Sequence, residues 1–389
     1  MDKKNLTTKD IPELTGLRGI AAAAILLNHV LLIAPDLRTT IFNRPLSMMG
    51  NLGVSLFFIL SGTVIYYNYA DKILINPAKE MSKFFLARFA RLYPLYFLFI
   101  VIFFMVNTFL LGHSGDLLAA DITSLPMFLF GLQDWVYGYI NNFQVVHLQG
   151  SANIGWSISC EFALYLLFIP FVLLLKPQKS IKNVIIIFIL SLFLRWIYLY
   201  FTYFDMSILN MWEDVYPGKS AQTRFYMIFY SPIGRFFEFM SGCAIAMLYS
   251  LNKPYSNYVK RMFSFVIIFC LLVLFLMSVK LINLPIDELT IISPILTLFI
   301  LAISICGSRF LRSKLLILMG EISYSTYLLH IMIVEGIKHF DGDSSYKIGY
   351  IVLFFVLTYF ISYFCYKYYE IPMKNKVKSF FSETKLGRN

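Results

Sequence analysis

Long apolar segments alternate with short polar ones along the whole chain. Ten segments are apolar and long enough to cross a bilayer, which takes about 20 helical residues. A further apolar stretch, residues 122–132, is too short to span, and we expect it to be re-entrant or interfacial. The pattern predicts an all-α polytopic membrane protein with about ten transmembrane helices in a single membrane domain. The ten segments are residues 14–34, 51–70, 92–111, 154–175, 183–203, 224–249, 262–280, 290–308, 315–335 and 348–366.

The polar segments between these spans carry most of the basic residues. With the N-terminus in the cytoplasm, 23 Lys and Arg residues fall in inner segments and six in outer ones. The positive-inside rule then places both termini inside. We predict a cytoplasmic tail at residues 1–13, a membrane domain at 14–370 and a basic cytoplasmic tail at 371–389. A signal peptide is the alternative for the first apolar run, but that run is long, contains polar residues and has no clear cleavage site.

Composition supports the membrane class and excludes others. The chain has 389 residues, of which 59% are hydrophobic and 14% charged, with a mean hydropathy of +0.70. A soluble domain of this size cannot bury so much apolar surface. The net charge of +11 falls in short clusters between apolar segments, which favours inner-face anchoring over nucleic-acid binding. The five cysteines lie in apolar stretches without metal-ligand spacing, so we expect buried thiols and no metal.

The first span carries two ionisable residues on one face. Arg18 and His29 are eleven positions apart, close to three helical turns, which places them roughly 16 Å apart along the axis. Ionisable residues inside a span are costly and usually face a cavity or a partner. Snorkelling to the two headgroup layers is the alternative. Because the pair is in phase and Asn28 lies beside the histidine, we favour a functional site.

Two further arginines precede the apolar part of the third span. Arg88 and Arg91 are three apart and therefore neighbours on a helix face. Together with Arg18 at the same depth they would form a cluster suited to phosphate, which Arg binds through a bidentate fork. Anchoring at the cytoplasmic boundary explains them as well, and the residues alone slightly favour that explanation.

Carboxylates occur within two other spans. Glu161, at the outer mouth of the fourth span, is placed to orient His29 or to share its proton, as the partner of a general base does. An ion pair with Arg195 or Arg235 is the alternative. Arg235 and Glu238 are three apart and can satisfy each other inside the membrane, so we favour a structural role for that pair.

Hydroxyl-bearing residues accompany these charges. Ser323, Tyr327 and His330 fall near one stripe of a helix, where they form either a packing network or a polar path. Ser61 and Ser157 are candidate acyl acceptors, although membrane helices often carry Ser for close packing. The chain has no nucleophile elbow, Walker loop or zinc-protease motif.

Six motifs, in order between about residues 10 and 375, resemble those of the acyltransferase-3 family, membrane enzymes that acylate extracytoplasmic glycans. Each motif alone would be a weak signal, and their order makes the resemblance strong. The motifs are Leu17-Arg18-Gly19 with His29; Gly53 to Gly62; Arg88 and Arg91 with Tyr93-Pro94; Trp156-Ser157-Ile158-Ser159 with Glu161; Ile322-Ser323-Tyr324-Ser325 with Tyr327 to His330; and Glu370-Ile371-Pro372.

The resemblance implies an enzyme that takes an acyl group, usually acetyl, from cytoplasmic acyl-CoA and delivers it to a glycan hydroxyl. Acetyl-CoA would be a co-substrate, with no permanently bound cofactor. The resemblance further implies that His29 and Glu161 are catalytic and that Arg18, Arg88 and Arg91 contact the acyl donor. Residues expected to support this site are Asn28, Ser61, Trp156, Ser157, Arg235, Glu238, Ser323, Tyr327 and His330.

Some relatives carry a fused extracytoplasmic SGNH-type hydrolase domain that completes the transfer. We expect a stand-alone form that transfers directly or through a separate extracytoplasmic partner. The prediction is a membrane O-acyltransferase of a bacterial cytoplasmic (inner) membrane, acting on a cell-surface glycan such as O-antigen (lipopolysaccharide), capsule or exopolysaccharide. A covalent acyl-enzyme relay stays open. The alternative is a transporter or flippase for a lipid-linked glycan, in which the same charged residues would form a substrate or proton path.

Overall fold

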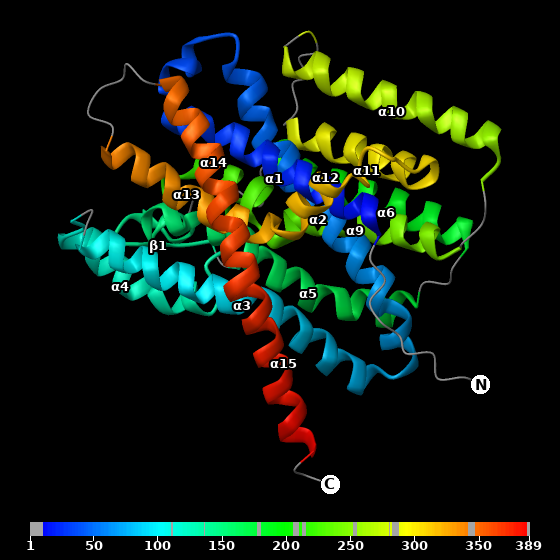
Figure 1. Cartoon of the computed structure of the whole chain (residues 1–389), viewed down its shortest axis with the longest axis horizontal. Coiled ribbons are helices and arrows are strands. Elements are labelled where there is room, and N and C mark those ends of the chain that lie inside the picture. Colours follow the sequence, from blue (N-terminus) through cyan, green and yellow to red (C-terminus); the bar gives the residue numbers. More distant parts are fainter. Residues whose placement is uncertain are drawn as a thin grey trace.

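The computed structural model describes residues 11–386 except 110–111, 136, 177–179, 205–209, 212–214, 252–254, 280, 282–287 and 341–346. Helices make up nearly all of the described chain (Figure 1). The one sheet in these described ranges is a short antiparallel hairpin of β1 (Tyr139–Ile140) and β2 (Phe143–Gln144). The predicted all-α membrane fold is therefore confirmed, whereas the hairpin was not anticipated from the sequence.

The long helices coincide with the predicted apolar segments. Each of the ten segments overlaps at least one helix, and the short apolar stretch at 122–132 falls on the 15-residue helix α4 (Gly115–Leu129). The remaining helices are α1 (Pro12–Ile33), α2 (Asn43–Ile75), α3 (Pro77–Phe109), α5 (Trp156–Leu175), α6 (Ile181–Leu199), α8 (Ser220–Phe225), α9 (Pro232–Ser250), α10 (Asn257–Ser278), α11 (Glu288–Cys306), α12 (Lys314–Glu321), α13 (Ser323–Phe340), α14 (Lys347–Cys365) and α15 (Ile371–Leu386).

Fewer helices than ten are apolar and long enough to cross a membrane unaided. Within the described residues, seven meet both criteria, and the number rises to eight if α12 and α13, bent by 69° at their junction, form one broken span. The apolar part of α11 is shorter than a full span. The segment predicted at 224–249 is divided into α8, a π-helical turn and α9, whose buried Arg235 and Glu238 reduce its hydropathy.

Two helices extend well beyond their apolar parts. α3 starts at Pro77 although its apolar segment starts near residue 92, so its first turns are charged and still helical. α14 continues through a π-helical turn (Tyr366–Glu370) into α15, so the basic tail predicted after residue 370 is a helix as far as it is described. In Figure 1, α15 projects away from the other helices.

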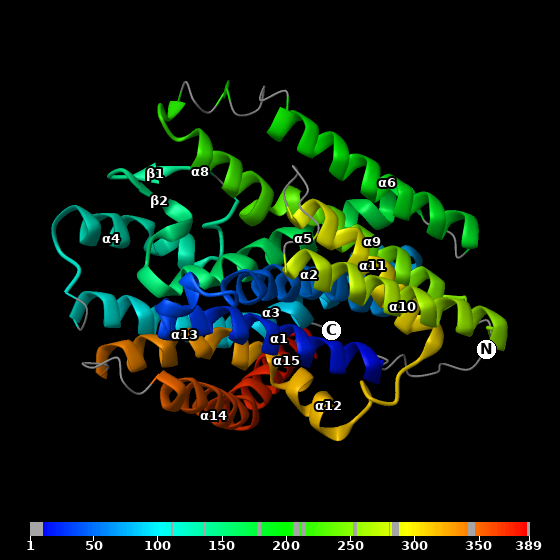
Figure 2. The same ribbon diagram turned by 90° about the horizontal axis from the view of Figure 1, so that it is seen from above.

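The helices are arranged as a curved row around α2. Across the row, α6 packs on α9, α9 on α2, α2 on α1, and α1 on α12 and α13, with α14 beyond them. Figure 2 shows the same sequence of helices from one side of the molecule to the other. Two glycines permit the close crossing of α2 and α9, because a Cβ on Gly62 would lie 2.0 Å from the carbonyl oxygen of Phe239, and one on Gly242 would lie 2.0 Å from that of Ile59.

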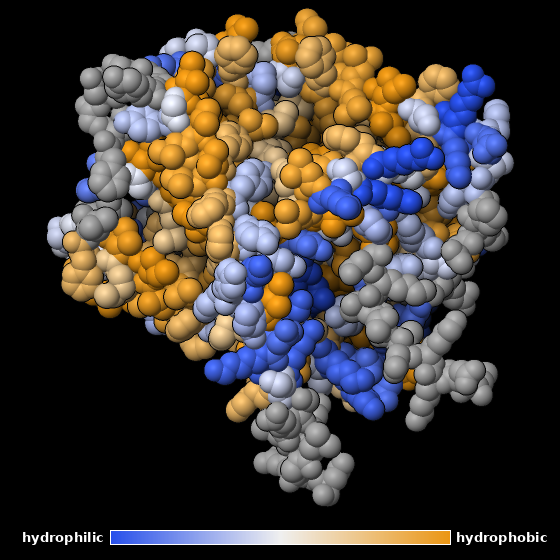
Figure 3. Space-filling view, viewed as in Figure 1, coloured by the Kyte–Doolittle hydropathy of each residue, from blue (hydrophilic) through white to orange (hydrophobic). Residues whose placement is uncertain are grey.

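Apolar side chains cover the outside of the outer helices. In Figure 3 hydrophobic residues spread over much of the visible face, and polar residues gather where α15 leaves the body. Patches of this size are costly in water but not in lipid, so these faces identify the lipid-contacting surface. Exposed apolar residues include Ile185, Ile189, Phe193 and Trp196 of α6; Phe265, Ile268, Phe269, Leu272 and Phe275 of α10; and Val352, Val356 and Phe360 of α14.

Candidate active site

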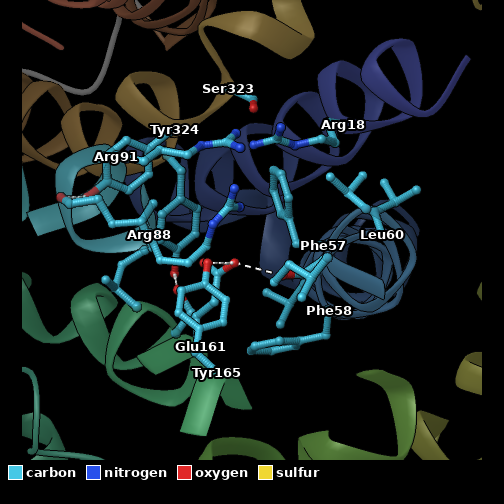
Figure 4. Close-up of a pocket in the computed structure, with 18 residues that line it drawn as sticks. Arg18, Phe57, Phe58, Leu60, Arg88, Arg91, Glu161, Tyr165, Ser323 and Tyr324 are labelled. Atoms are coloured by element: carbon cyan, nitrogen blue, oxygen red, sulfur yellow. Dashed lines mark hydrogen bonds between the residues drawn. The ribbon is translucent and has the colours of Figure 1, made fainter. Parts of the chain in front are cut away.

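A pocket lies at the centre of the row, between α1, α2, α3, α5 and α13 (Figure 4). Arg18 of α1 and both Arg88 and Arg91 of α3 line it, together with the carboxylate of Glu161 from α5. The structure thus brings together the three predicted donor-binding arginines and one of the two predicted catalytic residues. We call this the arginine pocket. Its other lining residues are Val54, Phe57, Phe58, Leu60, Ser61, Val64, Ile65, Leu92, Ser157, Ile158, Tyr165, Ser323, Tyr324 and Tyr327.

The two arginines of α3 lie inside the helix and not at its entrance. Because α3 starts at Pro77, Arg88 is roughly 16 Å along the helix axis from its first residue. Its Nη2 donates a hydrogen bond to the Tyr69 hydroxyl at 3.1 Å, and its guanidinium lies 5.2 Å from the centroid of the same ring. These contacts with Tyr69 hold the Arg88 side chain at the wall of the pocket.

Glu161 is the acidic member of the arginine pocket. Its Oε1 accepts hydrogen bonds from Ser61 Oγ at 2.8 Å and from the Tyr165 hydroxyl at 2.6 Å. Its charge acts on Arg18 and Arg88. The carboxylate therefore offsets part of the positive charge that the converging arginines bring into the protein interior.

This position corrects the predicted partnership of Glu161 with His29. The described hydrogen bonds of Glu161 go to Ser61 and Tyr165, and that of His29 goes from Nδ1 to the Ile25 carbonyl at 2.9 Å. In the sequence both residues had been placed near the outer side. The side chain of Glu161 instead turns toward the arginines, because a buried carboxylate is stabilised far more by cations than by a neutral imidazole.

A second carboxylate adjoins the same arginines. Glu370 is the last residue of the π-helical turn after α14, and its Oε2 accepts a hydrogen bond from Ser325 Oγ at 2.8 Å. Its charge acts on Arg91, Arg18 and the nearby Lys374. Glu370 belongs to one of the sequence motifs, although the motif assigned it no role. Tyr69 is one tyrosine among many in an apolar helix, and no pattern in the sequence marked it.

His29 lies outside the arginine pocket. Its ring packs edge to face against that of His330 in α13, with 4.7 Å between the ring centroids. The ring of Tyr327, which lines the pocket, lies 5.9 Å from that of His330. Tyr327 and His330 thus connect the pocket to the predicted catalytic histidine through ring contacts.

The hydroxyl-rich start of α13 is both a packing network and a wall of the pocket. Ser157 Oγ donates to the Tyr327 hydroxyl at 2.8 Å, which in turn donates to the Ile154 carbonyl at 2.8 Å. Ser323 and Tyr324 donate to backbone carbonyls of α12 and α3. The predicted hydrogen-bonded packing network is therefore confirmed for Ser323 and Tyr327, and the polar path stays a prediction.

The Arg235–Glu238 pair is structural, as predicted. Both side chains are fully buried in α9, with Arg235 Nη1 3.2 Å from Glu238 Oε2. Ser55 and Ser293 donate to the same carboxylate, and Arg195 lies 3.8 Å from it. The alternative in which these arginines pair with Glu161 is therefore wrong.

Two of the residues expected to support the site instead hold helices together. The guanidinium of Arg235 lies 5.6 Å from the centroid of the Trp156 ring. Trp156 therefore packs on the Arg235–Glu238 pair of α9. Asn28 lies in α1 and connects it to α2, because its Nδ2 donates a hydrogen bond to the carbonyl of Leu46 at 3.2 Å. Neither side chain lines the arginine pocket.

Metal-binding and thiol chemistry have no arrangement to support them in the described chain. Among the residues that the structure describes, no three His, Cys, Asp or Glu side chains are grouped as metal ligands. The five cysteines are free, with Cys160, Cys243 and Cys270 buried and the other two partly exposed.

The chain is similar to one protein family and to several of its members. The sequence model of the acyltransferase-3 family, described as an acyltransferase domain, matches residues 11–367. The O-acetyltransferase OatA of Staphylococcus aureus is 26% identical over 396 residues, covering 96% of this chain and 59% of that protein. The peptidoglycan O-acetyltransferase OatA of Listeria monocytogenes is 25% identical over 257 residues, or 63% of this chain and 35% of that protein.

The match to a third relative covers less of the chain. The acyltransferase MdmB of Streptomyces mycarofaciens is 32% identical over 168 residues, covering 41% of this chain and 38% of that protein. The chain spans about three-fifths of the length of the S. aureus relative. No solved structure matches it.

Proposed function

Because the chain belongs to the acyltransferase-3 family, we propose that it is a membrane O-acetyltransferase that moves an acetyl group from cytoplasmic acetyl-CoA to a hydroxyl of a cell-surface glycan. The O-acetyltransferase activity for which the S. aureus and L. monocytogenes relatives are named supports acetyl transfer to oxygen. The membrane would be the bacterial cytoplasmic membrane. Peptidoglycan, named for the L. monocytogenes protein, is the first acceptor to test, before O-antigen, capsule or exopolysaccharide.

The convergence of Arg18, Arg88 and Arg91 on one pocket carries this proposal. Three guanidiniums inside a membrane protein are costly unless an anion offsets them. Glu161 and Glu370 provide two negative charges, which leaves the cluster, with Lys374, net positive. The phosphates of acyl-CoA fit such a cluster, since Arg presents several donors in a rigid fork.

The apolar walls of the pocket suit the rest of the donor. Phe57, Phe58 and Val64 line it on the α2 side, where they would shield the pantetheine arm and the thioester from water. Tyr327 and His330 continue from the pocket toward His29. We place the phosphates at the arginines and the acyl group at the Tyr327 end.

His29 would then act as general base on the acceptor hydroxyl. Its Nδ1 proton is held by the Ile25 carbonyl, so Nε2 carries the free lone pair. The acceptor oxygen forms an ester bond with the acyl carbon as the carbon–sulfur bond of the thioester breaks. The hydroxyl proton moves to His29 Nε2 and from there to the departing CoA thiolate. A separate extracytoplasmic transferase would be needed only if the first acceptor is a carrier.

The test uses the host cell with the gene deleted. We would complement the deletion with the wild type, with His29→Ala and with the matched control Thr326→Val, each at equal protein level. Thr326 is buried in α13, the helix that carries His330, and its hydroxyl makes no described hydrogen bond. Mass spectrometry of peptidoglycan fragments and of the other surface glycans then reports the acetyl groups.

The expected result is that the wild type and Thr326→Val restore one class of acetylated glycan and that His29→Ala does not. Full acetylation by His29→Ala would overturn the assignment of the base. Loss of a whole polymer in the deletion strain, with no acetyl group missing from the glycans that remain, would instead indicate the transporter or flippase alternative.

A further inference from the structure

The catalytic histidine has no described carboxylate partner. A histidine base is usually oriented by a third group that also stabilises the imidazolium, most often an aspartate or glutamate. Here Nδ1 of His29 is bonded to a backbone carbonyl, which orients the ring but carries no charge. Glu161, the predicted partner, is engaged with Ser61 and the arginines. The ring of His330 is the group that packs against His29.

His330 is fixed in one tautomer by its surroundings. Its side chain is fully buried, and Nδ1 lies 2.6 Å from the carbonyl oxygen of Tyr327. A carbonyl only accepts, so the proton of the neutral ring is on Nδ1. Its Nε2 is then a bare lone pair, and this atom has no hydrogen-bond partner in the described structure. A buried acceptor without a donor is rare and calls for an explanation.

The single N–H of the His330 ring is directed at the Tyr327 carbonyl, so the Nε2 lone pair and the two π faces of the ring remain available. Both the lone pair and the π faces attract positive charge. The edge-to-face contact at 4.7 Å places His29 within the range over which such attraction acts. A proton acquired by His29 would therefore be stabilised by its neighbour.

The described charged side chains around His29 and His330 offer no other way to stabilise the imidazolium of His29. In the described part of the chain, Lys338 of α13 is the charged side chain that acts on His29, and it carries a positive charge. Glu335 partly offsets Lys338 through an ion pair at 3.1 Å.

We propose that His330 is a positioning residue for His29, which fixes the plane of its ring and stabilises the imidazolium that forms when His29 takes the acceptor proton. This inference rests on the proposed function. It assigns to a second imidazole the task that a carboxylate has in other histidine bases, and it gives the unpartnered Nε2 a role.

The test measures the protonation of His29 without any acyl acceptor. Diethyl pyrocarbonate modifies neutral imidazole, and peptide mass spectrometry reports the rate at His29 as a function of pH in the full chain in nanodiscs. The variants are His330→Leu, which removes the ring; His330→Phe, which restores a ring face; and the control Thr326→Val.

We expect the pH of half-maximal His29 reactivity to fall by about one unit in His330→Leu, because less stabilisation of the imidazolium lets the proton leave at lower pH. His330→Phe should recover part of the shift, and Thr326→Val none. Glycan acetylation in cells should fall about tenfold or more in His330→Leu at equal protein level.

The outcomes separate this inference from the proposed function. An unchanged pH profile in His330→Leu overturns the positioning role, even where acetylation falls, because that combination indicates packing alone. Full acetylation by His29→Ala overturns the proposed function whatever the profile of His330→Leu.

Discussion

Glu161 Oε1 accepts a hydrogen bond from Ser61 Oγ at 2.8 Å, which connects α5 to α2 across the wall of the arginine pocket. Tyr165 donates to the same oxygen from one helical turn further along α5. The carboxylate is therefore held in place by neutral donors while its charge acts on Arg18 and Arg88. Its negative charge offsets part of the positive charge of these arginines, and an anionic ligand in the pocket would offset more of it.

We predict that Glu161→Gln, which keeps the shape of the side chain, lowers the thermal midpoint of the detergent-solubilised protein. Removing one partner from a buried charge cluster leaves cations uncompensated and costs up to about 3 kcal/mol. Acetyl-CoA should raise the midpoint of Glu161→Gln more than that of the wild type, since its phosphates replace the missing charge. A smaller rise than in the wild type would contradict the proposed donor site.

Ser61→Ala tests the covalent relay on the same atoms. It removes one hydrogen bond, worth about 1 kcal/mol, and leaves the charge of Glu161 in place. For direct transfer we expect glycan acetylation within about threefold of the wild type. Complete loss of acetylation in a protein of normal thermal midpoint would indicate an acyl-enzyme on Ser61.

Arg88 and Arg91 should contribute to donor binding to different extents. Arg88→Lys keeps the charge but loses the fork and the fit over the Tyr69 ring, so we expect the apparent KM for acetyl-CoA to rise about tenfold or more. Tyr69→Phe removes only the hydroxyl that positions Arg88 and should raise the KM by a few-fold. Arg91→Gln removes a charge and should raise it most.

The thermal shift of each purified variant across a range of acetyl-CoA concentrations gives an apparent Kd, which should follow the same order as the KM. Acetyl-pantetheine, which has no phosphate, is the matched ligand. The variants should differ with acetyl-CoA and converge with acetyl-pantetheine. If acetyl-CoA stabilises neither the wild type nor Tyr69→Phe, the arginines do not bind the donor.

Much of the site was predictable because ionisable residues are rare in membrane spans. The cost of burying Arg18, Arg88 and Arg91 made each one a candidate, and their placement in one pocket confirms the predicted cluster. Helical spacing was enough to relate Arg88 to Arg91. The pairing of Arg235 with Glu238 followed from the same local rule.

Contacts between distant segments were not predictable from local patterns. Glu370 reaches Arg18 from the far end of the chain, and His330 meets His29 across two helices. The prediction for Glu161 failed because depth along a helix does not say which face turns toward which neighbour. The entrance of α3 was misplaced because hydropathy detects its apolar part, whereas the charged turns after Pro77 are equally helical.

Glu238 provides a contrast to Glu161, since its cluster does not line the arginine pocket. Glu238→Gln leaves Arg235 and Arg195 buried without a countercharge, so we expect a loss of about 3–5 kcal/mol and little folded protein. Acetyl-CoA should not rescue it, in contrast to Glu161→Gln. Size-exclusion profiles of the solubilised variants, with and without acetyl-CoA, provide the measurement, and a ligand-dependent recovery of Glu238→Gln would contradict its purely structural role.

The crossing of α2 and α9 should tolerate no side chain at its two glycines. In Gly62→Ala the new Cβ would lie 2.0 Å from the Phe239 carbonyl oxygen, and in Gly242→Ala 2.0 Å from that of Ile59, so backbone atoms must separate. Overpacking of this kind costs about 1–3 kcal/mol, and α2 also carries pocket residues, so both the thermal midpoint and acetylation should fall.

Gly336→Ala is the matched control, because a Cβ there meets nothing within 4 Å and the residue lies within α13. We expect that variant to be neutral or stabilised by up to about 1 kcal/mol, as alanine restricts the unfolded chain more than glycine does. Equal midpoints for Gly62→Ala and Gly336→Ala would mean that α2 and α9 can move apart freely. The arginine pocket would then not depend on their close approach, and the loss of acetylation expected for Gly62→Ala should be absent as well.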